Sequence, residues 1–262
     1  MPASYASHLQ TAVEAAKSAG QLIREAFGQT HSSQTKSNAR DLVTAVDLKS
    51  QEIIIDTLKR DFPDIPVVAE ESKQHSYNQE VLWLVDPLDG TTNFTRGIEL
   101  FSVSICLSVN LKPEAAVVYH PIFDHLYTAE SGGGAYMNDK LLKVSTSEAL
   151  EDFTVSSNLS YKNEERVVIL ENIGRLMMHT AGLRLIFSVA LELCHVARGS
   201  FDAAMIYKAN PWDMAAGCLI VSEAGGQVTN WSGEAWQITD ANCLASNARA
   251  HQNLRTMLFT GE

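Results

Sequence analysis

The stretch WLVDPLDGTTNF, residues 83–94, constrains the fold of this chain more than any other. An apolar run, typical of a buried strand, ends in Asp86 and Asp89, and a glycine and two threonines follow. Pro87 holds its own φ at about −65° and is expected to bend the chain out of the strand. Two carboxylates at one strand exit repel each other unless a cation lies between them. The arrangement therefore predicts either a cation site or a plain aspartate turn followed by a helix cap.

The groups that such a bend brings together decide which cation would fit. With the chain bent at Pro87, both aspartates and the Leu88 carbonyl oxygen can face one point. Hard divalent cations such as Mg²⁺ prefer oxygen ligands, and one carboxylate bridging two ions about 3.5–4 Å apart suits phosphoryl chemistry. Gly90 would let a ligand approach the backbone, and residues 91–93 are predicted to begin a helix whose amides hold phosphate. An EF-hand loop does not fit, because Leu88 and Gly97 fall where that loop needs oxygen side chains.

Three further segments carry acids at comparable places. Glu70 and Glu71 end the β-branched run PVVAEE, where an exposed pair would ordinarily be only solvated. Asp213 opens a late helix behind a proline and a tryptophan, where a negative charge also suits the helix dipole. Asp47 and Thr44, in DLVTAVD, could equally cap the second helix. Each signal alone is weak, but four acid-bearing segments together favour a shared site.

The overall charge excludes one class of function. The chain has 31 acidic and 20 basic residues, a formal net charge of −11, which argues against direct nucleic-acid binding. No stretch is apolar for long enough to cross a bilayer, so no membrane association is expected, and the first twenty residues lack the pattern of a secretory signal. The cysteines are widely spaced, without a CxxC pair, and are interpreted as reduced residues of a cytoplasmic protein. They are Cys106, Cys194, Cys218 and Cys243.

The order of predicted elements changes near residue 150. With 262 residues and 45% hydrophobic content, the chain suits one large domain or two closely packed ones. Its first part is predicted to hold a helix over 9–27, a polar loop over 29–40, a second helix ended by Pro63, and then a series of strands. Strand–helix alternation follows. We therefore expect an α/β (α+β) protein with subdomains at 1–150, carrying most acids, and 151–262, carrying Asp213.

These motifs together resemble one known family. DLVTAVD, AEES, WLVDPLDGTTNF and PWDMAAGCLIVSEAGG match, in order and spacing, the inositol monophosphatase family of Mg²⁺-dependent, lithium-sensitive phosphatases. The resemblance covers essentially the whole chain. It implies a layered α–β–α–β–α sandwich, of the type shared with fructose-1,6-bisphosphatase, that assembles as a homodimer.

The resemblance also implies roles for individual residues. It implies two Mg²⁺ ions per site and allows a third, weaker one near Glu70. Glu70, Asp86 and the Leu88 carbonyl would hold the first ion, and Asp86, Asp89 and Asp213 the second. Thr91, hydrogen-bonded to Asp47, would with Glu70 orient and deprotonate the attacking water. The amides of Gly90 and Thr91 would bind phosphate, with Asp89 and Asp213 beside it, and Lys36 matches a lysine that approaches the site in relatives.

The substrate pocket departs from the pattern of inositol-hydrolysing relatives. Counting back from Asp213, Ile206 falls where those relatives commonly carry a glutamate that binds sugar hydroxyls. Phe187 and Val189 fall where they commonly carry glycine and alanine, whereas Arg184 and Ser188 match family positions beside the substrate. An unpaired buried hydroxyl costs about 1–3 kcal/mol, so inositol 1-phosphate is predicted to be a poor or secondary substrate. A one-residue loop shift or hydroxyl contacts from another loop would remove this expectation.

The expected function is hydrolysis of a small phosphorylated metabolite. Direct attack of water on a phosphate monoester suits the motifs, because cations and preorganised amides neutralise the charge that develops on the transferring oxygens. The same motifs occur in 3′-phosphonucleotide, fructose-bisphosphate and histidinol-phosphate phosphatases, which remain alternatives. A role in protein contacts with the transcription machinery is the alternative from another class, because some bacterial relatives bind it.

Overall fold

The computed structural model describes residues 4–29, 33–35, 42–73, 75–160 and 162–259. Within these ranges the chain forms a seven-stranded sheet, a five-stranded sheet and a two-stranded ribbon. Lys36, predicted to approach the site, lies outside the described residues. None of the helices in these ranges is both long enough and apolar enough to cross a membrane.

The larger sheet belongs to the first half of the chain and is antiparallel except at one edge, where β3 and β4 run parallel. Its strands, in spatial order, are β3 (Val67–Ala69), β4 (Val81–Asp89), β5 (Ser102–Val109), β6 (Lys112–His120), β7 (His125–Glu130), β8 (Gly134–Met137) and β9 (Lys140–Leu141). The small ribbon pairs β1 (Ser33–Thr35) with β2 (Leu42–Thr44), inside a segment largely predicted as loop. The strand character of β1 therefore corrects that prediction and arises from pairing, since the segment has no apolar alternation of its own.

The smaller sheet belongs to the second half and mixes parallel and antiparallel pairs. Its strands, in spatial order, are β11 (Gly182–Arg184), β10 (Thr154–Ser157), β12 (Ala203–Ile206), β14 (Cys243–Ser246) and β13 (Gln227–Thr229). Because β10 and β12 are parallel, the loops that leave their carboxyl ends lie at one edge of the sheet.

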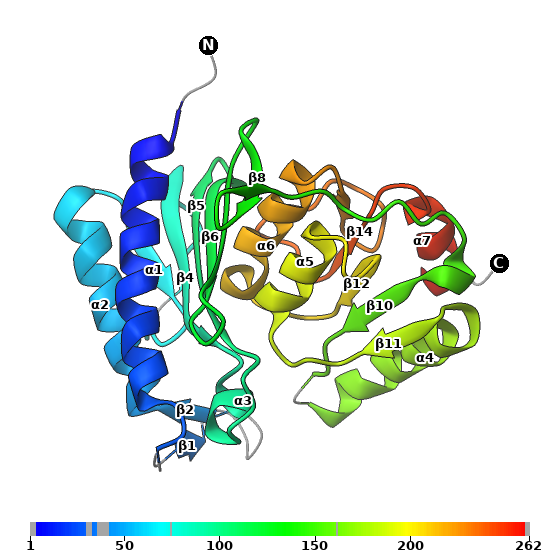
Figure 1. The fold of residues 1–262 in the computed structure, drawn as a ribbon, viewed down its shortest axis with the longest axis horizontal. Coiled ribbons are helices and arrows are strands. Elements are labelled where there is room, and N and C mark those ends of the chain that lie inside the picture. Colours follow the sequence, from blue (N-terminus) through cyan, green and yellow to red (C-terminus); the bar gives the residue numbers. More distant parts are fainter. Residues whose placement is uncertain (1–3, 30–32, 36–41, 74, 161, 260–262) are drawn as a thin grey trace.

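Helices cover both faces of each of the two larger sheets. They are α1 (Ala6–Ala26), α2 (Ala45–Asp61), α3 (Thr91–Thr95), α4 (Asn163–His179), α5 (Val189–Ala197), α6 (Pro211–Glu223) and α7 (His251–Phe259), with a short 3₁₀ turn at Leu150–Asp152. Figure 1 shows α1 and α2 outside the larger sheet, α5 and α6 between the sheets, and α4 and α7 outside the smaller sheet. Three separate apolar clusters fill the spaces between these layers. The predicted α–β–α–β–α sandwich is therefore confirmed.

Helix α6 occupies the centre of the molecule. Nine of its thirteen residues are buried, and buried positions occur on every side of the helix. A helix that is apolar all round belongs in a core, because it has no face to present to water. It packs against strands of both sheets, and its apolar residues join the cluster between them. This position fixes its first turn, which carries Asp213, at the junction of the two halves.

Strand β4 does not end at Pro87, which corrects the prediction that this residue bends the chain out of the strand. Asp86 pairs with Ser104 and Asp89 with Ser102, so three steps along β4 match two steps along β5. One extra residue forms a bulge that accommodates the missing amide of Pro87 and lets the strand resume. The bulge still delivers both carboxylates to the end of the strand.

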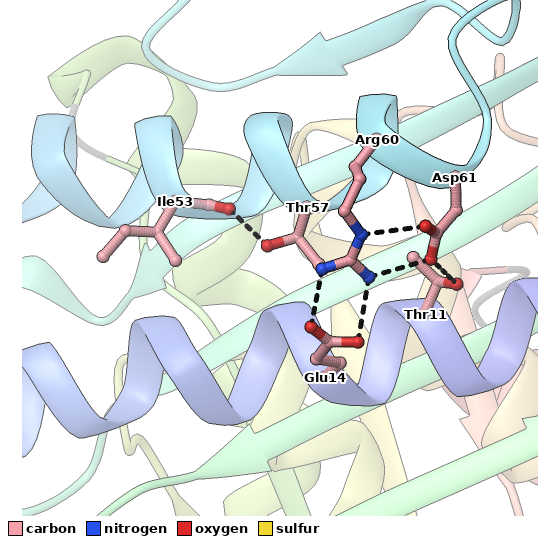
Figure 2. Close-up of polar contacts among 6 residues, drawn as sticks. All are labelled: Thr11, Glu14, Ile53, Thr57, Arg60 and Asp61. Carbon is pink, nitrogen blue, oxygen red and sulfur yellow. Dashed lines mark hydrogen bonds and ion pairs between the residues drawn. The ribbon is translucent and has the colours of Figure 1, made fainter.

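A polar contact on the outer face joins the first two helices (Figure 2). Arg60 of α2 donates to both carboxylate oxygens of Glu14 of α1, at 2.8 and 3.0 Å, and also to Asp61. Thr11 of α1 donates to the same Asp61 at 2.8 Å. Because Arg60 and Glu14 are about half exposed, the group aligns the helices more than it stabilises the fold.

Candidate active site

The four acidic side chains predicted for the site line one cavity, to which both halves of the chain contribute. The cavity has a volume of about 530 Å³ and includes Glu70, Asp86, Asp89 and Asp213 in its wall. Glu70 follows β3, the two aspartates end β4, and Asp213 lies in the first turn of α6. The structure thus brings together the acids of three segments that the sequence separates by up to 143 positions.

The charges of all three other acids act on Asp86. It is buried, and its Oδ1 atom accepts a hydrogen bond from the Leu88 amide at 3.0 Å inside the bulge. Burial, together with the charges of Glu70, Asp89 and Asp213, raises the pKa of Asp86 well above its ordinary value. A cation placed among these groups would relieve both effects, because it favours the ionised carboxylates.

Asp89 is held rigidly from the second half of the chain. Ser188 donates to its Oδ2 atom at 2.5 Å, Ala190 N–H to the same atom at 3.0 Å, and Val189 N–H to Oδ1 at 3.1 Å. Ser102 adds a bond of 3.3 Å to Oδ2. These donors at the start of α5 favour the charged form, yet burial still raises the pKa of Asp89 to about 6.

Asp213 caps the helix that carries it. Its Oδ2 atom accepts a hydrogen bond from the Asn210 amide at 2.9 Å, the arrangement of a helix-capping residue. Burial, with the charges of Glu70 and Asp89 next, raises the pKa of Asp213 well above its ordinary value. The capping role that a helix start suggests is therefore present, and it leaves the side chain on the cavity.

Glu70 reaches the cavity because its strand runs beside β4. Its amide donates to the Val85 carbonyl at 3.0 Å, which continues the parallel pairing of β3 with β4 by one residue. Glu71 is not part of the cavity wall, and its backbone amide donates to the side chain of Gln51 in α2. The pair is thus divided, with only Glu70 in the cavity wall.

Thr91 and Asp47 form a hydrogen-bonded pair beside the acids. Thr91 Oγ1 lies 2.9 Å from Asp47 Oδ1 and 3.1 Å from the Leu88 carbonyl oxygen. The other oxygen of Asp47 accepts from the amide and the hydroxyl of Thr44, at 2.8 and 2.5 Å, and caps α2. Asp47 is fully buried, and burial raises its pKa although the bonds from Thr44 and Thr91 oppose this. The capping contact and the contact with Thr91 that were considered for Asp47 are therefore both present.

Gly90 is required by the backbone at the entrance to α3. Its φ of 94° is left-handed, and a Cβ atom there would lie 2.9 Å from the Leu100 carbonyl oxygen. The short helix that begins at Thr91 confirms the helix start predicted there. Thr91 and Thr92 both line the cavity, so the first turn of α3 faces the acids.

The chemistry of these acids suits a hard cation, although their side chains do not form a closed metal-binding cluster. Among the residues that the structure describes, no three histidine, cysteine, aspartate or glutamate side chains are arranged as a metal centre. Oxygens of Asp86, Asp89 and Asp213 instead accept the internal hydrogen bonds given above. The donors available are nevertheless oxygen atoms, three of them on carboxylates whose pKa burial raises, which is the donor set that Mg²⁺ prefers.

The predicted pocket residues divide between the cavity and its surroundings. Phe187 and Val189 line the cavity, and Phe187 adopts a left-handed φ of 56°. Ser188 is fully buried and holds Asp89. Arg184 lies exposed at the end of an edge strand, and its guanidinium donates to the Leu183 carbonyl. Ile206 is fully buried in the cluster between the sheets. The structure therefore does not bring Arg184 and Ile206 to the cavity wall.

Sequence reasoning missed much of the remaining cavity wall. This part comprises the loops after β10 and β12 and the rings of His75 and Trp212, whose centroids lie 4.5 Å apart at an interplanar angle of 50°. The missed residues are His75, Asn158, Leu159, Ser160, Lys162, Glu165, Lys208, Ala209, Asn210 and Trp212. Two signals could have found most of them. Parallel strands end at one sheet edge, and residues 208–212 immediately precede Asp213.

Fold and site together define a class: a layered α–β–α–β–α protein with a carboxylate-lined cavity between its two sheets. Residues 5–260 match the inositol monophosphatase family. Inositol monophosphatase 3 from Solanum lycopersicum is 40% identical over 250 residues, which cover 92% of each chain. Nus factor SuhB from Salmonella typhimurium is 37% identical over 246 residues, covering 92% of this chain and 91% of the relative.

The solved structures agree. The crystal structure of the extragenic suppressor protein suhB from Bartonella henselae superposes with a TM-score of 0.91 at 34% identity, covering 98% of this chain and 100% of that one. The chain belongs to the inositol monophosphatase family, which makes it a member of a phosphatase superfamily.

Proposed function

We propose that the chain hydrolyses small phosphate monoesters in a Mg²⁺-dependent reaction, by direct attack of water on phosphorus. One observation carries the proposal: Glu70, Asp86, Asp89 and Asp213 share one cavity with the Thr91–Asp47 pair beside them. Buried carboxylates gathered in this way are stable as ions only with a cation among them. Membership of a phosphatase family supports the reaction class.

The residues that would hold Mg²⁺ are Glu70, Asp86, Asp89, Asp213 and the carbonyl oxygen of Leu88. Bound there, Mg²⁺ supplies Lewis acidity, which lowers the pKa of water and neutralises charge on the phosphoryl oxygens. The number of ions stays a prediction from the resemblance. Asp89 adds rigidity to this set, since its four hydrogen bonds prevent its carboxylate from rotating.

Thr91 provides an oriented acceptor for the attacking water. Its single hydroxyl proton is directed to Asp47 Oδ1, the nearer of two acceptors, at 2.9 Å. The lone pairs of Thr91 Oγ1 then point away from Asp47 and can accept a hydrogen bond from water in the cavity. Glu70, which also lines the cavity, is the group placed to take the other proton of that water as it attacks phosphorus.

The first turn of α3 receives the phosphate. The amides of Gly90 and Thr91 stand at the helix start, where no preceding turn supplies acceptors. Amides in this position bind phosphate oxygens and stabilise the charge that develops during phosphoryl transfer.

Inositol 1-phosphate is proposed as a secondary substrate, although a relative carries the name inositol monophosphatase. Ile206 cannot bind a hydroxyl group, and it is buried away from the cavity wall. Phe187, whose side chain is 38% exposed at the cavity, narrows the space that a polyol ring would need. A kcat/KM for inositol 1-phosphate far above that of other phosphomonoesters would contradict this part of the proposal.

Phosphate release from a substrate panel, with Mg²⁺ titrated, tests the proposal. The panel includes inositol 1-phosphate, a 3′-phosphonucleotide, fructose 1,6-bisphosphate and histidinol phosphate, because these distinguish the alternatives. Asp89→Asn replaces one carboxylate oxygen by an uncharged NH2 group and should lower kcat/KM by about a thousandfold or more. Asp64→Asn, at an exposed turn after α2, is the matched control and should retain activity.

Full activity in a folded Asp89→Asn protein would refute the cation site.

The named Nus factor among the relatives supports protein contacts with the transcription machinery as the second candidate. A chain that acts only in that way would show no Mg²⁺-dependent hydrolysis of any panel member, before or after the substitution.

A further inference from the structure

The cavity wall also carries two cationic side chains. Lys162, just before α4, and Lys208, just after β12, both line the cavity, and Glu165 lies between them. Lys208 Nζ is 3.1 Å and Lys162 Nζ 3.7 Å from the same Glu165 oxygen, Oε1. The second Glu165 oxygen accepts from Ser160 at 2.5 Å.

This group holds more positive charge than its internal pairing requires. Two ammonium groups share one carboxylate, so one positive charge is left over on a chain whose net charge is −11. The Lys208 and Lys162 side chains are 46% and 61% exposed, whereas Glu165 is 13% exposed. The carboxylate is therefore enclosed while both ammonium groups remain accessible. An ion pair that served only to join the two loops would need one lysine.

The backbone that carries Lys208 is built to hold it there. Lys208 has a left-handed φ of 47°, a conformation that costs free energy for a residue with a side chain. Asn158 holds the preceding residue, Tyr207, by two hydrogen bonds of 2.9 and 3.0 Å. Asn242 Oδ1 accepts a hydrogen bond from the Lys208 backbone amide at 3.0 Å. The centroid of the Tyr207 ring lies 5.5 Å from the Lys208 ammonium group. Hydrogen bonds from Asn158 and Asn242 thus maintain an unfavourable backbone conformation at Lys208. Such maintained strain often indicates a functional role for the residue.

We infer that Lys208 and Lys162 form a second anion-binding subsite, which selects phosphate monoesters carrying a further carboxylate or phosphate group. The inference rests on the proposed function, because it assigns the scissile phosphate to the acidic side of the cavity. A substrate with anionic groups at both ends then spans the cavity, one end at Asp86 and Asp89 and the other at Lys208. Glu165 holds the two ammonium groups in place and competes with the incoming anion for them.

Matched substrate pairs measure this selection directly. 3-Phosphoglycerate and glycerol 3-phosphate differ only by a carboxylate in place of a hydroxymethyl group. Fructose 1,6-bisphosphate and fructose 6-phosphate differ by a second phosphate. The quantity measured is the ratio of kcat/KM values within each pair, and the pair with the larger ratio identifies the anion that the subsite prefers.

Variants on the two sides of the ion pair separate a binding role from a structural one. Lys208→Ala should lower the ratio by about fivefold, the upper range for a partly exposed charge pair, and the double variant with Lys162→Ala should lower it further. Glu165→Gln should raise the ratio, because it releases both ammonium groups to the anion. Lys17→Ala removes an equal charge from an exposed position on α1 and should leave the ratio unchanged.

Opposite shifts for Lys208→Ala and Glu165→Gln support the subsite, and added salt should reduce both shifts. Shifts in the same direction, or a ratio unaffected by either variant, would overturn it and leave hydrolysis of neutral esters intact. Calorimetric binding of 3-phosphoglycerate with Ca²⁺ in place of Mg²⁺ keeps the two proposals apart. Binding weakened by Lys208→Ala without any hydrolysis by the wild-type chain would support the subsite and refute the proposed phosphatase reaction.

Discussion

The two carboxylate oxygens of Asp47 serve two different purposes. Oδ2 caps α2 through Thr44, and Oδ1 holds the Thr91 hydroxyl at the cavity. One buried side chain therefore links the start of a helix to the group proposed to orient water. The sequence left capping and catalysis open as alternatives, because both require the same residue type at the same place.

Substitutions on either side of Asp47 should separate its two functions. Thr91→Val removes the hydroxyl with little change of shape, and we expect kcat to fall about a hundredfold. Thr44→Ala removes the capping hydroxyl, and we expect the free energy of unfolding to fall by about 1 kcal/mol with a smaller effect on kcat. Steady-state kinetics and urea denaturation of both variants provide the comparison. A larger loss of kcat in Thr44→Ala than in Thr91→Val would contradict the assignment.

His251 makes stability depend on pH. Its ring nitrogens lie 3.0 Å from Thr229 Oγ1 and 2.8 Å from Ser246 Oγ, and burial lowers its pKa from 6.5 to about 4. The unfolded chain takes up a proton near pH 6.5, whereas the folded chain resists protonation until about pH 4. The contribution of His251 to stability is therefore full above pH 6.5 and is lost as the pH falls from 6.5 towards 4.

The His251→Gln variant tests this dependence. Wild type and variant are compared by urea denaturation at several values between about pH 7.5 and about pH 4.5. The difference in unfolding free energy should be largest at the upper end and should shrink as the pH falls. Using the difference removes the opposing effect of the buried carboxylates, whose pKa burial raises. A difference that is constant across this range would refute the prediction.

At the scale of elements, helix α6 depends on close contact with α5. A Cβ atom added to Gly217 would lie 2.5 Å from Leu193 Cβ, so the two helices would have to separate. We expect Gly217→Ala to lower the free energy of unfolding by about 1–3 kcal/mol. Gly174 in α4 has no atom within 4 Å of the same added group, which makes it the matched control. Gly174→Ala should raise stability by about 0.5 kcal/mol or more, and equal losses in the two variants would contradict the packing argument.

Most elements could be predicted because their signals are local. The apolar period of α1, the proline that follows α2 and the glycines after α6 all lie in the sequence at the ends where the structure needs them. The bulge at Pro87 could not be predicted, since it depends on which residues of β5 lie opposite. The short strand β11 was missed for the same reason, because its pairing with β10 defines it.

The candidate site follows the same division. The acids could be predicted because each stands at the end of an element, where a backbone signal marks it. Counting residues also placed Ile206 beside the substrate, but the direction of a strand side chain depends on the sheet, and it lies in the core. The position of Lys208 could not be predicted from local sequence. Its left-handed backbone depends on hydrogen bonds made by Asn158 and Asn242, which are distant in sequence.

At the scale of the whole molecule, the two halves share one core. The predicted boundary at residue 150 separates the two sheets, and it stays a prediction as a boundary between domains. The cluster between the sheets nevertheless contains Leu84 and Val118 from the first half with Leu193 and Ile220 from the second. Because the acids of the cavity come from both halves as well, neither half contains a complete site.

The homodimer implied by the resemblance stays a prediction, and the outer face of α4 is where we propose to test it. Met177 and Met178 are 66% and 80% exposed, and Val167 and Leu170 are more than half exposed. Contact with a second copy would remove this apolar surface from water, and identical faces suit a two-fold axis. Met177→Lys with Met178→Lys should convert a dimer to a monomer in sedimentation velocity. Leu141→Lys, at an exposed position on β9, should leave the dimer unchanged. A wild-type chain that sediments as a monomer would refute the dimer itself.

The central place of α6 also has a consequence for synthesis. The last strand of the larger sheet ends at Leu141, so the sheet emerges from the ribosome before the helix that covers its inner face, Pro211–Glu223. A nascent chain therefore carries an uncovered apolar sheet until α6 has been synthesised, and it is open to aggregation during that interval. Chaperone demand during translation should consequently be high, and a ribosome stalled before α6 should hold a chain without the cavity.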